Sequence, residues 1–134
     1  MTRTTLHVNH ALDAQQEMSR LKSRMLMKSY YVMFRDVVDG SRIAAAALDH
    51  YRWVIGLEKD GRVFASGPLF EADERQGTGM TVLRAASFEE ACTFAEADPF
   101  VSSGAMTFRI RRWQLNEGRL QLHLDLSDQT YHLE

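Results

Sequence analysis

The alternation of hydrophobic and polar residues divides the chain into short strands and two longer helices. Residues 30 to 35 are rich in aromatic and branched types, which favours a strand, and residues 62 to 66 and 79 to 86 form the next two predicted strands. Between the first and second strands, residues 42 to 59 carry an alanine run of high helix propensity. Residues 107 to 115 alternate apolar and basic side chains, as a half-buried strand should.

The helix predicted over residues 42 to 59 is expected to turn one apolar stripe to the core. The members of this stripe recur at helical spacing and are Ala44, Ala47, Leu48, Tyr51 and Ile55. Asp60 and Gly61 should end the helix, because glycine readily adopts the left-handed conformation of a helix C-terminus.

A second helix is predicted to begin at Ser87. Glu90 follows three residues later, which is a capping-box pattern in which each side chain satisfies a backbone amide of the first turn. The buried face of this helix is expected to comprise Phe88, Ala91, Cys92 and Ala95. The chain has only two prolines: Pro99 is expected to end this helix, and Pro68 to end the second strand.

Both ends of the chain extend beyond this central pattern. Residues 11 to 25 place small and apolar side chains three and four residues apart, which predicts an amphipathic N-terminal helix within residues 1 to 26. We expect it to dock through Ala14, Met18, Leu21 and Met25. At the other end, Asn116-Glu117-Gly118 predicts a hairpin turn, and alternating leucines predict an extra strand at about residues 119 to 126. The main domain is thus expected to span residues 27 to 134.

The predicted order of elements is β-α-β-β-α-β, followed by the extra strand. This order is typical of the α+β, ferredoxin-like split βαβ fold, in which an antiparallel sheet carries both helices on one face. An apolar face on the other side of the sheet needs a cover. We expect a second copy of the chain to supply it, which predicts a homodimer. The N-terminal helix or the extra strand could share this task.

Composition narrows the functional classes. The chain has 134 residues, of which 45% are apolar, so it can build one core. Its 16 basic and 18 acidic residues give a formal charge of -2, which argues against nucleic acid or an anionic membrane as a partner. We expect a small-molecule ligand, no cofactor and no metal, since the histidines and the single cysteine, Cys92, lack ligand spacing. No signal peptide or membrane span of ~20 apolar residues is visible, which predicts a cytoplasmic protein.

His50 and Asp98 are the residues best suited to acid-base chemistry. His50 lies beside apolar residues of the first helix, where a neutral imidazole can exchange a proton near pH 7. A packed histidine without a catalytic role fits the same pattern. Asp98 stands at the predicted end of the second helix, where the helix dipole disfavours a carboxylate, so it is a candidate for a functional role. A simple Asp-Pro turn is the alternative interpretation.

Two further features are candidates for a ligand-binding wall. Ser66-Gly67-Pro68 ends the second predicted strand with a glycine that lets a ligand approach the backbone, and a plain turn explains it equally. Phe100 is either an apolar wall of the cleft or a core aromatic. The arginines at 109, 111 and 112 are better explained as a solvated strand face than as an anion site.

Four short motifs carry a resemblance to a known family. They are Asp49-His50-Tyr51, the segment from Gly61 to Pro68, Ser87-Phe88-Glu89-Glu90-Ala91, and the segment from Ala97 to Gly104. In this order, over about residues 28 to 113, the chain resembles the YciI-like (YCII-related) family. The resemblance implies a dimeric ferredoxin-like fold and a pairing of His50 with Asp98. It also implies that Ser66, Gly67, Pro68 and Phe100 line a substrate cleft.

The resemblance also bears on activity. The family is similar in fold to muconolactone isomerases and includes a dehydrochlorinase of chlorinated hydroxyquinols. We therefore expect a His50-Asp98 dyad that performs cofactor-independent proton transfer on a small molecule, as in an isomerase or a lyase. The alternative is a non-catalytic module that binds a small ligand or a protein. Where members of the family often have Arg-Pro-Ala before the histidine, this chain has Ala47-Leu48-Asp49, so any contact made by that arginine is lost or replaced.

Overall fold

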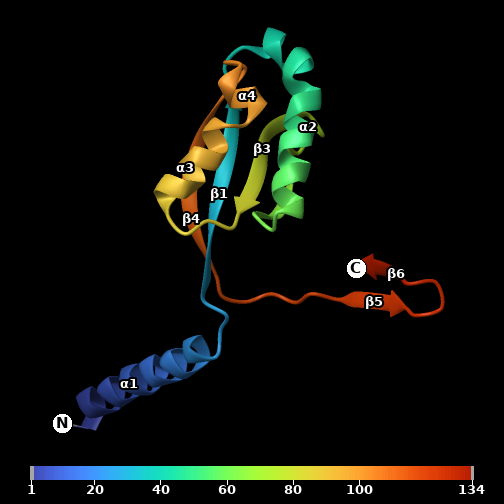
Figure 1. Cartoon of the computed structure of the whole chain (residues 1–134). Helices are drawn as coiled ribbons and strands as arrows, with labels where there is room; N and C mark the ends of the chain where they lie inside the picture. Colours follow the sequence, from blue (N-terminus) through green and yellow to red (C-terminus); the bar gives the residue numbers. More distant parts are fainter. Residues whose placement is uncertain (1, 134) are drawn as a thin grey trace. The chain divides into compact units, whose positions relative to one another are not determined.

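The chain forms two compact units. The computed structural model describes the backbone of residues 2–133 and the side chains of residues 11–133 (Figure 1). One unit is Ser29–Gln114, and the other is built from the segments before and after it. No helix among the described residues is both long enough and apolar enough to cross a membrane.

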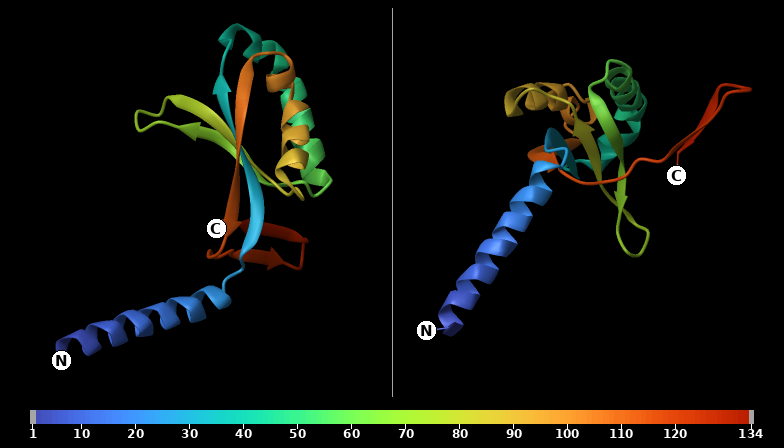
Figure 2. Two further views of the ribbon diagram at one scale, coloured as in Figure 1. Left: turned by 90° about the vertical axis from the view of Figure 1, so that its left-hand side faces the viewer. Right: turned by 90° about the horizontal axis from the view of Figure 1, so that it is seen from below.

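The Ser29–Gln114 unit is built on a four-stranded sheet with the order β2-β3-β1-β4. The strands are β1 (Lys28–Val37), β2 (Val63–Phe70), β3 (Gln76–Leu83) and β4 (Met106–Leu115). Strand β3 pairs antiparallel with both β1 and β2. The helices are α2 (Ile43–Lys59), α3 (Phe88–Glu96) and the one-turn α4 (Pro99–Ser102), and α2 is preceded by the 3-10 turn η1 (Gly40–Arg42). This is the expected α+β, ferredoxin-like arrangement, with the helices over one face of the sheet (Figure 2).

The hydrophobic core lies between the helices and the sheet. Its fully or nearly fully buried members come from β1, β2, β3 and α3 and are Tyr31, Met33, Val63, Leu83, Ala91 and Ala95. Alternate residues of β1 supply Tyr31 and Met33, as the two-residue period of a strand requires. The next residue in this inward series is Arg35, which is 3% exposed.

The predicted core stripe of α2 is wrong. Leu48 and Tyr51 are each 60% exposed and Ile55 is 45% exposed, whereas Ala46 and His50 are buried. The helix contacts α4 and β2, and this packing turns the face that contains His50 inward. A hydrophobicity pattern counts histidine as polar, so it could not assign His50 to the buried face. Gly61 does adopt the predicted left-handed conformation after the helix, with φ 76°.

Neither proline ends its element as predicted. Strand β2 continues through Pro68 to Phe70, and β2 is an edge strand, the place in a sheet where proline is tolerated. Pro99 begins α4 instead of ending α3, which already stops at Glu96. Because proline has no N–H to lose, the first position of a helix suits it.

The helix cap predicted at Ser87 is observed. The Ser87 hydroxyl accepts a hydrogen bond from the Glu90 amide at 3.1 Å. The Glu90 carboxylate accepts a hydrogen bond from Arg62 at 2.9 Å.

In the second unit, the hairpin predicted around residues 116 to 118 is wrong. The segment after β4 instead contains β5 (Leu122–Asp125), which pairs antiparallel with β6 (Thr130–Leu133) in a separate two-stranded sheet. The turn is made by the residues before β6, where Gln129 takes a positive φ of 58° and Asp128 accepts from the Thr130 amide. The N-terminal helix α1 spans Thr2–Ser23. Ala14, Met18 and Leu21 are exposed on it, so its docking surface stays a prediction.

Candidate active site

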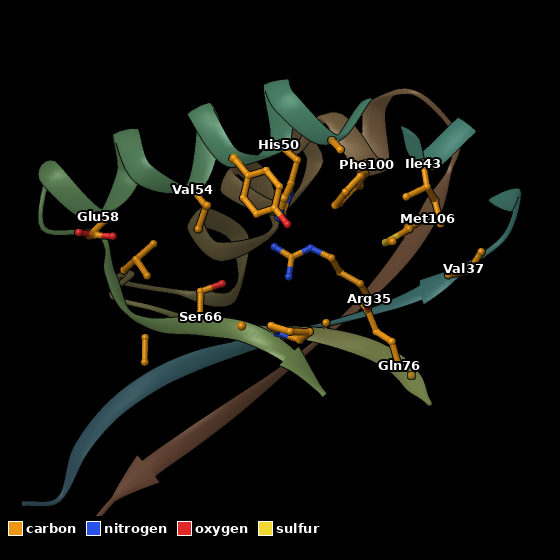
Figure 3. Close-up of a pocket in the computed structure, with 18 of the residues that line it drawn as sticks. Arg35, Val37, Ile43, His50, Val54, Glu58, Ser66, Gln76, Phe100 and Met106 are labelled. Carbon is orange, nitrogen blue, oxygen red and sulfur yellow. The ribbon is translucent and has the colours of Figure 1, made fainter. Parts of the chain in front are cut away.

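A cavity of about 790 Å³ lies within the Ser29–Gln114 unit, between α2 and the strands β2 and β3 (Figure 3). Most of its wall is apolar and includes Val37, Ile43, Ala47, Val54, Val63, Phe64, Phe100 and Met106. Its polar wall residues include Arg35, His50, Tyr51, Glu58, Ser66 and Gln76. A cavity of this size with a few polar groups suits a small organic ligand.

His50 connects this cavity to a buried carboxylate. Its Nδ1 lies 2.7 Å from Oδ1 of Asp98, which is completely buried behind it. The ring of Phe100 stacks on the imidazole, with the centroids 4.1 Å apart and the planes inclined by 23°. The hydrogen bond and the stacked ring together hold the imidazole in one orientation. Its other nitrogen, Nε2, has no hydrogen-bond partner among residues 11–133, and His50 lines the cavity.

Asp98 owes its position to a local cap and a long-range ion pair. As the N-cap of α4, it accepts a hydrogen bond from the Phe100 amide at 3.0 Å through Oδ1. Its Oδ2 accepts from Nε of Arg35 at 2.7 Å. Asp98 directly follows the C-cap of α3, as predicted, but it also begins a new helical turn, so its carboxylate lies at the N-terminal end of α4, where the helix dipole favours it.

The protonation state of Asp98 follows from these contacts. Burial alone would raise its pKa, but the hydrogen bonds from His50 and Arg35 and the positive charge of Arg35 outweigh burial and hold the pKa below the usual 3.8. Asp98 is therefore ionised at neutral pH and can only accept hydrogen bonds. Nδ1 of His50 must then carry a proton, so in the neutral form of the imidazole the lone pair lies on Nε2. The arrangement presents a proton acceptor to the cavity.

Two residues of this network, Arg35 and Thr81, were not predicted from the sequence. Nη2 of Arg35 donates to Oγ1 of Thr81 at 2.8 Å, and Oγ1 of Thr81 lies 2.7 Å from Oγ of Ser66. A continuous polar chain thus runs from His50 through Asp98, Arg35 and Thr81 to Ser66. Arg35 could have been recognised because it continues the inward alternation of β1, where a charge is unexpected.

The structure brings all the predicted site residues to one region. His50, Ser66, Gly67, Pro68 and Phe100 line the same cavity, and Asp98 contacts it through His50. Their catalytic and ligand-binding roles stay predictions. Within the described part of the chain, no three His, Cys, Asp or Glu side chains converge as metal ligands would.

Comparisons with known proteins agree with this fold. The structure of 5-chloro-2-hydroxyhydroquinone dehydrochlorinase from Burkholderia phenoliruptrix AC1100, in complex with 2,5-dihydroxybenzoquinone, is similar with a TM-score of 0.54 and 22% sequence identity. The similarity covers 63% of this chain and 93% of the dehydrochlorinase. Among curated proteins, none matches the chain. The sequence model of the YCII-related domain matches residues 29–114, which is more than half of the chain. The chain therefore belongs to the YCII-related domain family, as its motifs indicated.

Proposed function

We propose that the cavity is the active site of a small-molecule enzyme in which His50 transfers protons and Asp98 holds it in the reactive tautomer. The observation that carries this proposal is the 2.7 Å bond between Nδ1 of His50 and Oδ1 of Asp98, with Nε2 left for a ligand. The stacked ring of Phe100 supports it, because a base works best when its orientation is already set.

The chemistry that such a pair performs needs no cofactor. In an isomerisation, Nε2 takes a proton from a carbon beside a carbonyl group, the C–H electron pair forms a C=C bond, and the carbonyl π electrons move to oxygen. The imidazolium then returns the proton to a different carbon. In an elimination, the C–H electron pair expels a leaving group such as chloride, and His50 later releases the proton to water. Neither route consumes an oxidant or a reductant.

The reaction can be tested with compounds chosen for their chemistry. The similar protein from Burkholderia is a dehydrochlorinase, so 5-chloro-2-hydroxyhydroquinone is the first compound to assay, by chloride release under anaerobic conditions. A panel of unsaturated lactones and cyclic ketones follows, with deuterium uptake from D₂O measured by NMR. His50→Gln is expected to lower the rate of any active compound by about 10²- to 10⁴-fold, the usual contribution of a positioned base.

His132→Gln is the matched control for this variant. His132 also faces a carboxylate, with Nε2 3.6 Å from Oδ2 of Asp125, but this pair is exposed on the β5–β6 hairpin. Its replacement should leave the rate unchanged. A rate that survives His50→Gln refutes the catalytic role of His50. If instead ligands raise the melting temperature while wild-type protein exchanges no protons with them, the alternative of a non-catalytic binding module is correct.

A further inference from the structure

Arg35 is a buried cation with one edge turned to the cavity. Its side chain is 3% exposed, and two of its three nitrogens are engaged: Nε with Asp98 at 2.7 Å and Nη2 with Thr81 at 2.8 Å. The third nitrogen, Nη1, has no hydrogen-bond partner among the described residues. Arg35 lines the cavity, and Figure 3 shows its guanidinium group pointing into the space between His50 and Ser66.

The guanidinium group is held rigidly in this orientation. Thr81, which accepts from Nη2, is itself within 2.7 Å of the Ser66 hydroxyl, and the indole of Trp53 lies 5.6 Å from the guanidinium carbon. Gly79 borders the free nitrogen: a methyl group at this position would lie 3.4 Å from Nη1. The glycine therefore leaves open the space that an acceptor for Nη1 would occupy.

The charges around the cavity favour an anion at this point. Both oxygens of Asp98 are already engaged, Oδ1 by His50 and the Phe100 amide and Oδ2 by Arg35, and the carboxylate has no exposed surface. The negative charge of Asp98 is thus shielded from the cavity, whereas Nη1 of Arg35, which has no hydrogen-bond partner among the described residues, faces the cavity. Figure 3 shows Glu58 at the other end of the cavity, beyond Val54. A guanidinium edge binds a negatively charged oxygen more strongly than a neutral one.

We propose that the cavity binds small organic anions, and that Nη1 of Arg35 donates to the negative oxygen of the ligand while His50 faces its carbon skeleton. This inference rests on the function proposed above and names the substrate class for that site: an apolar ring that carries an ionised hydroxyl, an enolate or a carboxylate. Arg35 also has a role during proton transfer. When His50 removes a proton from carbon, negative charge collects on the conjugated oxygen, and Nη1 stabilises it there.

Matched chromogenic probes test the inference. The first is 4-nitrophenolate, measured at a pH where the phenol is ionised; 4-nitroanisole has the same ring with a neutral methyl ether; and 4-nitrobenzoate carries a carboxylate. Wild-type protein should bind 4-nitrophenolate about 10- to 100-fold more tightly than 4-nitroanisole, because only the phenolate can accept a charge-assisted hydrogen bond from Arg35. The absorption band of bound phenolate should also shift. The affinity of 4-nitrobenzoate then distinguishes a general oxyanion site from one that prefers phenolates and enolates.

Two variants assign the preference to Arg35. Arg35→Met is expected to remove the discrimination between 4-nitrophenolate and 4-nitroanisole. Because this variant removes the ion pair of Asp98, Gly79→Ala is the second test. It keeps the Arg35-Asp98 pair, adds a methyl group beside Nη1 and should weaken phenolate binding several-fold. Arg109→Met is the matched control, since Arg109 is an exposed arginine paired with Asp36. It should bind the probes as the wild type does.

The outcomes separate this inference from the proposed function. His50→Gln should keep the phenolate preference while it loses proton transfer. Equal affinity of wild-type protein for the phenolate and the ether overturns the inference. So does a preference that survives both Arg35→Met and Gly79→Ala, or the absence of binding by either anion at millimolar concentration. Proton transfer that depends on His50 but shows no preference for anions would overturn this inference alone.

Discussion

Replacing Asp98 by asparagine should reveal how much stability the buried network contributes. Asparagine has nearly the same shape as aspartate but carries no charge and has only one acceptor oxygen. If its oxygen occupies the Oδ1 position, it still accepts from His50 and from the Phe100 amide, but its NH₂ group faces Nε–H of Arg35. If the amide is flipped, its NH₂ group occupies the Oδ1 position and faces two other donors, Nδ1–H of His50 and the Phe100 amide. In both orientations, the Arg35 guanidinium loses its counter-charge.

The size of the effect follows from burial. Asp98 is 0% and Arg35 3% exposed, and removal of one partner from such a buried pair costs about 3 to 5 kcal/mol. The Arg109-Asp36 pair is a useful contrast, because its side chains are 62% and 41% exposed and pairs of this kind contribute about 0 to 1 kcal/mol. Since a domain typically has about 5 to 15 kcal/mol of stability, Asp98→Asn should remove a large share of it.

Urea denaturation followed by the fluorescence of Trp53 and Trp113 measures this difference, with Asp36→Asn as the matched control. The double variant Arg35→Met with Asp98→Asn completes a mutant cycle. The double variant contains neither charge of the pair, so no uncompensated charge from the pair stays buried. Its loss of unfolding free energy should therefore be about 1 to 3 kcal/mol smaller than the sum of the losses of the two single variants. If Asp98→Asn costs no more than Asp36→Asn, or if the cycle is additive, the network does not stabilise the fold in this way.

Acid unfolding, the mass in solution and an N-terminal deletion provide three more tests. Because the pKa of Asp98 is lowered in the folded chain, its ionised carboxylate stabilises the fold at pH values above 3.8. This stabilisation is lost as the pH falls through the lowered pKa. Acid unfolding curves should show the loss in wild-type protein and not in Asp98→Asn. Light scattering should give twice the 15.3 kDa of one chain, since the helices cover only one face of the sheet, and a monomer mass at micromolar concentration would contradict this. Deletion of residues 1–26 should lower the melting temperature, because the apolar stripe of α1 is predicted to dock. The affinity for 4-nitrophenolate should not change, because the cavity lies within Ser29–Gln114. An unchanged melting temperature would show that the stripe does not contribute to stability.

Local patterns were sufficient for the order of the strands and helices and for some of their ends. The cap at Ser87 and the left-handed Gly61 depend on residues within a few positions of each other, so they can be recognised in the sequence. Short motifs also identified the family and indicated that His50 and Asp98 belong together. Local patterns fail at the C-terminal hairpin: they predict a turn at residues 116 to 118 and a single extra strand, whereas β5 pairs with β6 through a turn that they do not indicate.

The sequence by itself therefore determined the succession of the main strands and helices of the Ser29–Gln114 unit and named three residues of the polar network, His50, Asp98 and Ser66. Only the tertiary structure decided which face of α2 is buried, that Asp98 caps a new helical turn, and that Arg35 joins the site. Arg35 and Asp98 are 63 positions apart, so the local sequence around either residue gives no sign of the other. In the folded chain, the hydrogen bond between them and those that they form with His50, Thr81 and the Phe100 amide offset the cost of burial. That compensation depends on the register of β1 and the packing of α2, which exist only once the sheet has formed.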